Sequence, residues 1–326
     1  HSALGTRHYS RFYYICTSMK QSRNSYFPWL ILVGLVLTWG SSFILIKQGL
    51  EGFSYDSRIV GSLRIVISFL VLLPLALMRL KRVKRKQWGV LAIVGIISNA
   101  APAFLFARAQ TGIDSNMAGI LNSLTTLFTL MIGLAFFHLK PKWFNIIGVF
   151  TGLAGAAGLI YFSGNGGFAF NFSYAVYVLI ATIFYAASVN IIKTYLVELD
   201  AVSITAISFL IIGMPVCIYL LFFTDFLQQL AHSQEAWNGL GYISILAVVG
   251  TALALIFFNM LIKMTSALFA ASVTYMIPIV AIGWGILDGE QFDWDYLIWI
   301  MMILGGVYLV NVKNIFSKKT DKTFVQ

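Results

Sequence analysis

Charge is what this sequence has least of. Only 10% of its 326 residues are Asp, Glu, Lys or Arg, whereas an average soluble domain carries about 25%. That shortage excludes most soluble folds, because too few charges remain to cover a water-exposed surface. Two cysteines, Cys16 and Cys217, exclude a disulfide framework, and six prolines without a low-complexity tract argue against disorder. The sequence instead has 59% hydrophobic residues and a mean hydropathy of +0.85, which predict a polytopic membrane protein.

Several motifs are also missing, and each absence removes a class of function. The chain has no GxxxxGKS/T phosphate-binding loop, no HExxH motif and no Cys/His cluster with metal-ligand spacing. We therefore expect no ATP-driven motor, no metal site, no cofactor, no catalytic residues and no enzyme activity. In a soluble protein the net charge of +10 would suggest nucleic acid. In a membrane protein it reflects topology and contact with anionic lipids, so no nucleic-acid partner is expected.

Ten apolar stretches are long enough to cross a membrane as helices, which takes about 20 residues each. They lack the alternation of a β-barrel, and most connections between them are short. The sequence therefore predicts an all-α polytopic membrane protein with ten transmembrane helices. The predicted spans cover residues 27–46, 59–78, 88–107, 116–137, 143–162, 174–192, 204–223, 240–262, 268–287 and 296–312.

The basic residues predict how these spans are oriented. If the N-terminus is cytoplasmic, 18 of the 22 Lys and Arg residues fall on the cytoplasmic side, many of them in the loop 79–86. The positive-inside rule then places both termini in the cytoplasm. Residues 1–26 form a basic cytoplasmic segment without the apolar core of a cleavable signal peptide. We expect residues 1–18, which precede Met19, to be upstream sequence, and residues 313–326 to form a basic cytoplasmic tail.

The chain contains a weak internal duplication. In the first span Trp39, Ser42 and Lys47 match Tyr185, Ser188 and Lys193 of the sixth span at one offset, and a second match joins the fourth and ninth spans at a slightly larger offset. This predicts a first repeat over 27–162, a linker loop over 163–173 and a second repeat over 174–312. Each repeat has five spans, an odd number, so the second must be inverted. Inverted repeats recur in secondary transporters, in which rocking of the halves gives alternating access to a midplane site.

A set of short motifs runs through both halves. They are Trp39-Gly40-Ser41-Ser42-Phe43 with Lys47, then Leu63-Arg64, a glycine-rich fifth span, and Ala270-Ala271-Ser272 followed by Pro278 and Gly289-Glu290. Together they resemble the drug/metabolite transporter superfamily, in its ten-helix EamA-type branch. The first half departs from the pattern, since Thr126 replaces the usual proline and Phe137-His138 replace Gly-Glu. The resemblance implies a multi-pass carrier of small metabolites in the inner (cytoplasmic) membrane, often an exporter of amino acids or related compounds.

Polar and aromatic side chains within the spans are the candidates for a substrate site. Aromatic residues can line an apolar cavity, asparagines can donate and accept without titrating, and an arginine can bind a carboxylate. We expect the cavity to be lined by spans one, three, four, six, eight and nine. The predicted substrate-binding residues are Trp39, Ser42, Arg64, Asn99, Asn122, Tyr185, Asn190, Asn259 and Tyr275, and the predicted gating or structural residues are Gly40, Lys47, Pro278 and Glu290.

Each candidate also has a structural interpretation. Arg64 can form an ion pair with Glu51, Asp56 or Asp114 instead of binding a substrate, and intramembrane asparagines often serve as hydrogen bonds between helices. Lys47 can simply extend toward the membrane surface. No Asp or Glu lies in the middle of a predicted span, which disfavours proton coupling through a central carboxylate.

The sequence therefore predicts a secondary transporter that exports a small-molecule metabolite, an amino acid or related organic acid. Within transport, the alternative is an exchanger of anions or organic phosphates that uses Lys47, Arg64 and Lys193. From other classes, the alternatives are a membrane enzyme acting on lipid-linked substrates and a non-transporting membrane subunit. The oligomeric state stays open, and a monomer is compatible with the sequence.

Overall fold

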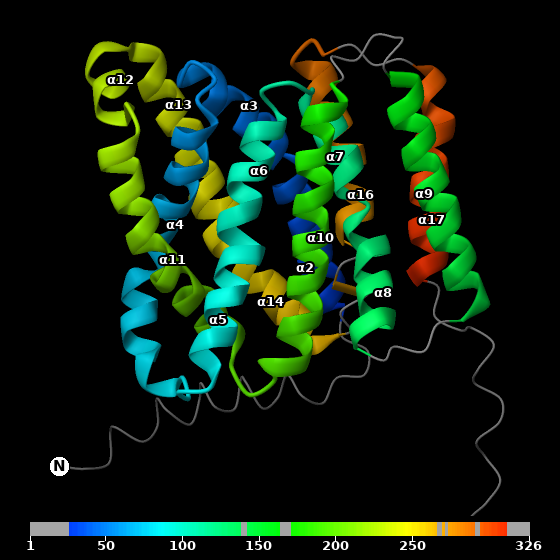
Figure 1. Cartoon of the computed structure of the whole chain (residues 1–326), viewed down its shortest axis with the longest axis horizontal. Coiled ribbons are helices and arrows are strands. Elements are labelled where there is room, and N and C mark those ends of the chain that lie inside the picture. The colour runs from blue at the N-terminus through cyan, green and yellow to red at the C-terminus, as the bar shows by residue number, and fades with distance from the viewer. Residues whose placement is uncertain are drawn as a thin grey trace, which may run out of the picture.

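The molecule is an all-helical bundle (Figure 1). A computed structural model describes residues 26–137, 142–163, 171–265, 269–270, 273–290 and 294–311, and every regular element within them is a helix. Most of the helices run between two ends of the bundle. We call them the Lys47 end, after a residue of α3 (Ser42–Gly52), which lies at the top of Figure 1, and the Lys193 end, after a residue in the last turn of α10 (Phe172–Tyr195), which ends at the bottom.

The helices of the first predicted repeat follow one another with short connections. They are α2 (Phe27–Gly40), α3 (Ser42–Gly52), α4 (Ser57–Arg79), η1 (Leu80–Arg82), α5 (Gln87–Gly95), η2 (Ile96–Ala100), α6 (Ala101–Ala109), α7 (Ser115–Asn122), α8 (Thr125–Phe136) and α9 (Trp143–Ser163).

In the described part of the second predicted repeat, the short helix α12 stands between two of the long helices. Its helices are α10 (Phe172–Tyr195), α11 (Ala201–Phe223), α12 (Phe226–His232), α13 (Gln234–Ile245), η3 (Leu246–Leu253), α14 (Ala254–Met264), α16 (Val273–Leu287), η4 (Trp294–Tyr296) and α17 (Leu297–Asn311).

Many of these helices are apolar enough to cross a membrane. In the described part of the chain, seven helices are both long enough and apolar enough to cross a membrane. Three shorter apolar helices coincide with the remaining predicted spans. The polytopic helical class predicted from the sequence is thereby confirmed. The seven candidates are Phe27–Gly52, Ser57–Arg82, Gln87–Ala109, Ser115–Phe136, Phe172–Tyr195, Ala201–Phe223 and Gln234–Met264, and the shorter helices are Trp143–Leu159, Met276–Leu287 and Trp294–Leu309.

Corresponding helices of the two repeats begin with the same local signal. Asp56 precedes α4 and its carboxylate accepts a hydrogen bond from the backbone N–H of Arg58; Asp200 precedes α11 and accepts from the backbone N–H of Ser203. An aspartate at this position satisfies backbone donors that a helix N-terminus leaves unpaired. The two capped helices, α4 and α11, pack against each other.

The third long helix of each repeat contains a π-helical segment. The segment η2 interrupts the helix between α5 and α6, and η3 interrupts the helix between α13 and α14. A π-helical turn holds an extra residue, and such turns occur frequently at functional sites. Both segments contribute side chains to the central cavity described below.

Small residues allow α16 to lie close to α2 and α7. A Cβ atom added to Gly40 would lie 2.4 Å from the Cβ of Val280, and one added to Gly119 would lie 2.4 Å from the Cβ of Ala281. Glycine at these crossings lets the backbones approach, as in other membrane helix pairs. Gly40, predicted to be gating or structural, therefore lies at a contact between the two predicted repeats.

Candidate functional site

A cavity lies where helices from both predicted repeats meet. The space among its lining residues measures about 760 Å³, a figure that includes open solvent. The lining is apolar and aromatic with a few polar groups. The described residues around it are Trp39, Ser42, Phe43, Ile46, Arg64, Ser98, Asn99, Phe106, Asn122, Thr125, Tyr185, Val189, Thr251, Leu255, Phe258, Thr274 and Ile277.

Six of the nine predicted substrate-binding residues lie in this lining: Trp39, Ser42, Arg64, Asn99, Asn122 and Tyr185. The lining comes from α2 and α3, η2 and α6, α7 and α8, α10, η3 and α14, and α16, which are the six spans expected to surround the cavity. One further helix, α4, contributes through Arg64. The second span was not among those expected to line the cavity.

Trp39 connects the two predicted repeats across the cavity wall. Its indole Nε1 donates a hydrogen bond to the carbonyl oxygen of Gly250 in η3, at 2.9 Å. Its ring packs edge-on against Phe258, with 4.8 Å between the ring centroids. The hydrogen bond satisfies the polar edge of a buried indole, so the aromatic face of Trp39 is held at a defined place in the cavity.

Arg64 contacts neutral groups at the cavity. Its Nε donates to the Oγ1 of Thr251 at 2.8 Å, and its guanidinium also interacts with the Tyr185 hydroxyl. Thr251 in turn donates to the carbonyl of Leu246. No ion pair of Arg64 with Glu51, Asp56 or Asp114 is found among the described residues, and Asp56 pairs with Arg58 instead.

Asn99 places an unused hydrogen-bond acceptor at the cavity wall. The residue lies in η2 and is only 7% exposed. Its Oδ1 is buried and has no hydrogen-bond partner among the described residues. Buried polar atoms in proteins are nearly always paired. An orphaned acceptor beside a cavity is therefore available to a donor on a bound molecule.

The other predicted asparagines connect helices away from the cavity lining. Asn190 Nδ2 donates to the carbonyl oxygen of Thr129 in α8 and to that of Ala186 in its own helix, both at 3.0 Å. Asn259 Nδ2 donates to the Oγ1 of Thr205 in α11 at 2.9 Å. Both thus have the structural role considered for intramembrane asparagines. Tyr275 belongs to α16, but its side chain lies outside the described part of the structure.

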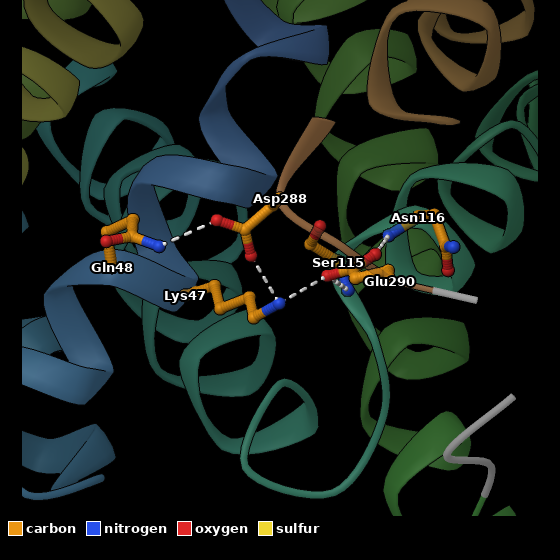
Figure 2. Close-up of polar contacts among 6 residues, drawn as sticks. All are labelled: Lys47, Gln48, Ser115, Asn116, Asp288 and Glu290. Carbon is orange, nitrogen blue, oxygen red and sulfur yellow. Dashed lines mark hydrogen bonds and ion pairs between the residues drawn. The ribbon is translucent and has the colours of Figure 1, made fainter. Parts of the chain in front are cut away.

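At the Lys47 end, a buried carboxylate holds the two predicted repeats together (Figure 2). Glu290 is 2% exposed at its side chain and lies 3.0 Å from Lys47 Nζ. Its two oxygens accept hydrogen bonds from the backbone N–H groups of Ser115 and Asn116, each at 3.1 Å, where α7 begins. A carboxylate here also interacts favourably with the dipole of α7.

Asp288 completes this network from a more exposed position. It lies 2.5 Å from Lys47 Nζ and accepts from the amide of Gln48 at 3.0 Å (Figure 2). Lys47 directly follows Ile46, which lines the cavity. The network therefore joins the two predicted repeats next to the cavity lining. Lys47 and Glu290, two of the four residues predicted to be gating or structural, take part in it.

At the Lys193 end, two lysines bridge neighbouring helix ends. Lys193 of α10 donates to the carbonyl oxygens of Ile262 and Thr265 at the end of α14. Lys263 of α14 donates to those of Leu196 and Val197 at the end of α10. These carbonyls carry partial negative charge that a lysine stabilises. Lys193 is thus engaged outside the cavity lining.

Ion pairs at the same end join the first predicted repeat to the second. Arg79 and Arg82 approach Asp200, and Lys84 lies 2.7 Å from Glu198. Burial raises the pKa of Asp200, but the hydrogen bonds from Ser203 and the charge of Arg79 outweigh it and hold this pKa below its ordinary value. These contacts involve α4 and α11 and the loops beside them. Apart from Arg64 on α4, neither helix lines the cavity.

Sequence reasoning missed several lining residues, above all the threonines. Thr125, Thr251 and Thr274 all face the cavity. One signal could have identified Thr274, because it stands 152 positions after Asn122, at the offset of the second internal match. The Oγ1 of Thr274 also lies 3.0 Å from that of Thr126, so α8 and α16 are joined by a threonine pair.

Comparison with known proteins identifies the family. A model of the EamA-like transporter family matches residues 27–161 and 172–312. The chain belongs to this family. Membership supports a multi-pass membrane transporter of small molecules, and it confirms the resemblance seen in the sequence motifs.

Two relatives match most of the length of the chain. The chain is 25% identical over 292 residues to the "Uncharacterized inner membrane transporter YedA" of Escherichia coli, covering 88% of this chain and 92% of that one. It is also 25% identical over 291 residues to the "Uncharacterized transporter YvbV" of Bacillus subtilis, covering 87% and 92%. A crystal structure with 14% identity matches with a TM-score of 0.62 over 86% of this chain and 95% of that chain, which supports the fold.

Proposed function

We propose that this EamA-family protein is a secondary transporter that exports an amino acid or related organic acid by alternating access between two inverted halves. The proposed topology has ten spans, with both termini in the cytoplasm and the Lys47 end facing outward. The distribution of basic residues supports this orientation. The family match, which falls into two segments close to the two predicted repeats, supports the two-half organisation.

The observation that carries the proposal is that equivalent positions of the two halves line one cavity. Trp39 and Tyr185 both line it, and Phe43 and Val189 do so as well; the members of each pair are 146 residues apart. A site at the junction of inverted repeats is reached from opposite sides when the halves rock. The closed network around Glu290 supports a gate at one end of this path.

The anion-exchanger alternative receives less support from the geometry. It needs Lys47, Arg64 and Lys193 to act together on one substrate. Lys47 is paired with Asp288 and Glu290, and Lys193 is bound to backbone carbonyls of α14. Of the three, Arg64 alone lines the cavity. No observation in the described structure favours the membrane-enzyme alternative or the non-transporting subunit.

Counterflow in proteoliposomes tests the proposal. Purified protein should exchange at least one radiolabelled member of a panel of amino acids and organic acids across the vesicle membrane. Asn122→Ala, in the cavity wall, should reduce the exchange about tenfold or more. Asn190→Ala is the matched control, because it removes an interhelical amide outside the lining. Its exchange per folded molecule should stay within about twofold of wild type. Absence of exchange for every panel member by the folded wild-type protein would contradict the proposal.

A further inference from the structure

The cavity carries one positive charge and no negative one in its described lining. Arg64 is the charged side chain there. Ten of the twelve acidic residues lie in the described part of the chain, and none of these ten lines the cavity. The other two are Asp293 and Asp321, which the sequence places in a connecting segment and in the C-terminal tail.

No described residue places an opposite charge against Arg64. Its polar contacts, Thr251 and Tyr185, are uncharged. A charge in a weakly polar cavity is costly unless an opposite charge accompanies it. Lys47 pairs with both Asp288 and Glu290 outside the described lining, so these three groups do not pair with Arg64. A bound molecule with one negative charge would therefore supply the opposite charge for Arg64. The planar guanidinium can form two parallel hydrogen bonds to a carboxylate.

The other residues of the lining indicate which further groups a bound ligand would carry. The orphaned Oδ1 of Asn99 requires a hydrogen-bond donor. Rings of Trp39, Phe106 and Phe258 and the aliphatic side chains among them provide an apolar wall. An ammonium group could donate to Asn99, but it would bring a second positive charge into a cavity without a carboxylate to receive it. A neutral hydroxyl or N–H group meets the same need without that penalty.

We propose that the cavity selects a small organic acid of net charge −1 over the zwitterionic amino acid of the same shape. Arg64 binds the carboxylate, Asn99 accepts a hydrogen bond from a neutral donor, and the aromatic wall contacts an apolar body. This inference rests on the proposed function and narrows its substrate from amino acids and related acids to the acids.

Four isosteric probes separate the parts of this proposal: phenyllactate, phenylalanine, 3-phenylpropanoate and phenyllactamide. Their dissociation constants are measured on the full chain in nanodiscs through ligand-dependent thermal stability. Phenyllactate should bind at least about tenfold more tightly than phenylalanine and phenyllactamide, since each mismatch leaves a buried charge or donor without its partner. Its advantage over 3-phenylpropanoate, which lacks the hydroxyl, should be a few-fold to tenfold.

Matched variants assign these preferences to residues. Arg64→Gln should remove the preference for phenyllactate over phenyllactamide, and Asn99→Ala should remove the preference for phenyllactate over 3-phenylpropanoate. Arg58→Gln is the control, because Arg58 lies on the same helix but is 55% exposed and pairs with Asp56 outside the cavity lining. It should leave all four constants within about twofold.

The outcomes distinguish charge selection from transport. Equal or tighter binding of phenylalanine, binding of none of the four probes, or an acid preference that survives Arg64→Gln would overturn the proposed selectivity. Counterflow of amino acids by a protein with such a result would leave the transport function intact. Binding of phenyllactate that depends on Arg64, without counterflow of any solute, would support the site and contradict transport.

Discussion

Replacing Glu290 with glutamine tests whether the network at the Lys47 end holds the cavity closed. The variant keeps the shape of the side chain but removes its charge. It also places an amide NH₂ where one oxygen now accepts from Lys47 or from the backbone of α7. Hydrogen bonds to charged groups contribute about 1.5–3 kcal/mol, and breaking a buried ion pair costs about 3–5 kcal/mol. We therefore expect the closed arrangement to lose about 3 kcal/mol.

A loss of about 3 kcal/mol shifts the ratio of closed to open molecules by about a hundredfold. The shift can be read from the accessibility of the cavity. A single cysteine at Ser42, in a background without Cys16 and Cys217, lines the cavity and reports on it. Its modification by a membrane-impermeant thiol reagent, applied at the Lys47 end, should be at least tenfold faster in the Glu290→Gln protein.

Asp288→Asn provides the matched control for this experiment. Asp288 also pairs with Lys47, but its side chain is 24% exposed, and ion pairs open to solvent contribute about 0.2–1 kcal/mol. Its loss should accelerate labelling by about fivefold or less. Labelling that stays within twofold of the background protein in the folded Glu290→Gln variant would refute the assignment of this network as a gate.

Two further predictions concern stability. Gly40→Ala should lower the melting temperature by several degrees, because the new Cβ would lie 2.4 Å from that of Val280 and overpacking costs about 1–3 kcal/mol; Gly34→Ala, with no atom within 4 Å of the new Cβ, is the control and should not destabilise. Asp200 should stabilise the protein at neutral pH and progressively less in acid, since its pKa is held below the ordinary value in the fold and that contribution is lost as pH falls through the folded pKa. Asp200→Asn should therefore lower the melting temperature at pH 7 and have little effect near pH 3, as measured by thermal denaturation at a series of pH values. An equal effect at both pH values would contradict a lowered pKa of Asp200 in the folded protein.

The membrane class and much of the cavity wall could be predicted from the sequence, for identifiable reasons. Long apolar runs have few structural alternatives, and the internal duplication pointed to Trp39 and Tyr185 together, both of which line the cavity. Arg64 was recognisable because a charge within a span is rare. The neutral partner of Arg64 could not be recognised from the sequence, since Thr251 lies 187 residues away along the chain.

Other parts of the site could not be recognised from residue type. An asparagine within a span can face a cavity or connect two helices, and Asn99 and Asn259 differ in this respect only through their surroundings. Threonine is still less informative, because its hydroxyl commonly bonds to its own helix, as Thr129 does with the carbonyl of Thr125. The pairing of Lys47 with Glu290 joins positions 243 residues apart, which local patterns do not reveal.

The reciprocal lysine bridge between α10 and α14 has a practical consequence for spectroscopy. Because Lys193 and Lys263 each hold the end of the other's helix, these two ends should keep a fixed separation whichever way the bundle opens. Tyr195 and Met264 are exposed neighbours of the bridge and leave both lysines in place when labelled. The distance between spin labels at these two positions should not change when the bundle opens. It would serve as a reference for distances between labelled positions that do move.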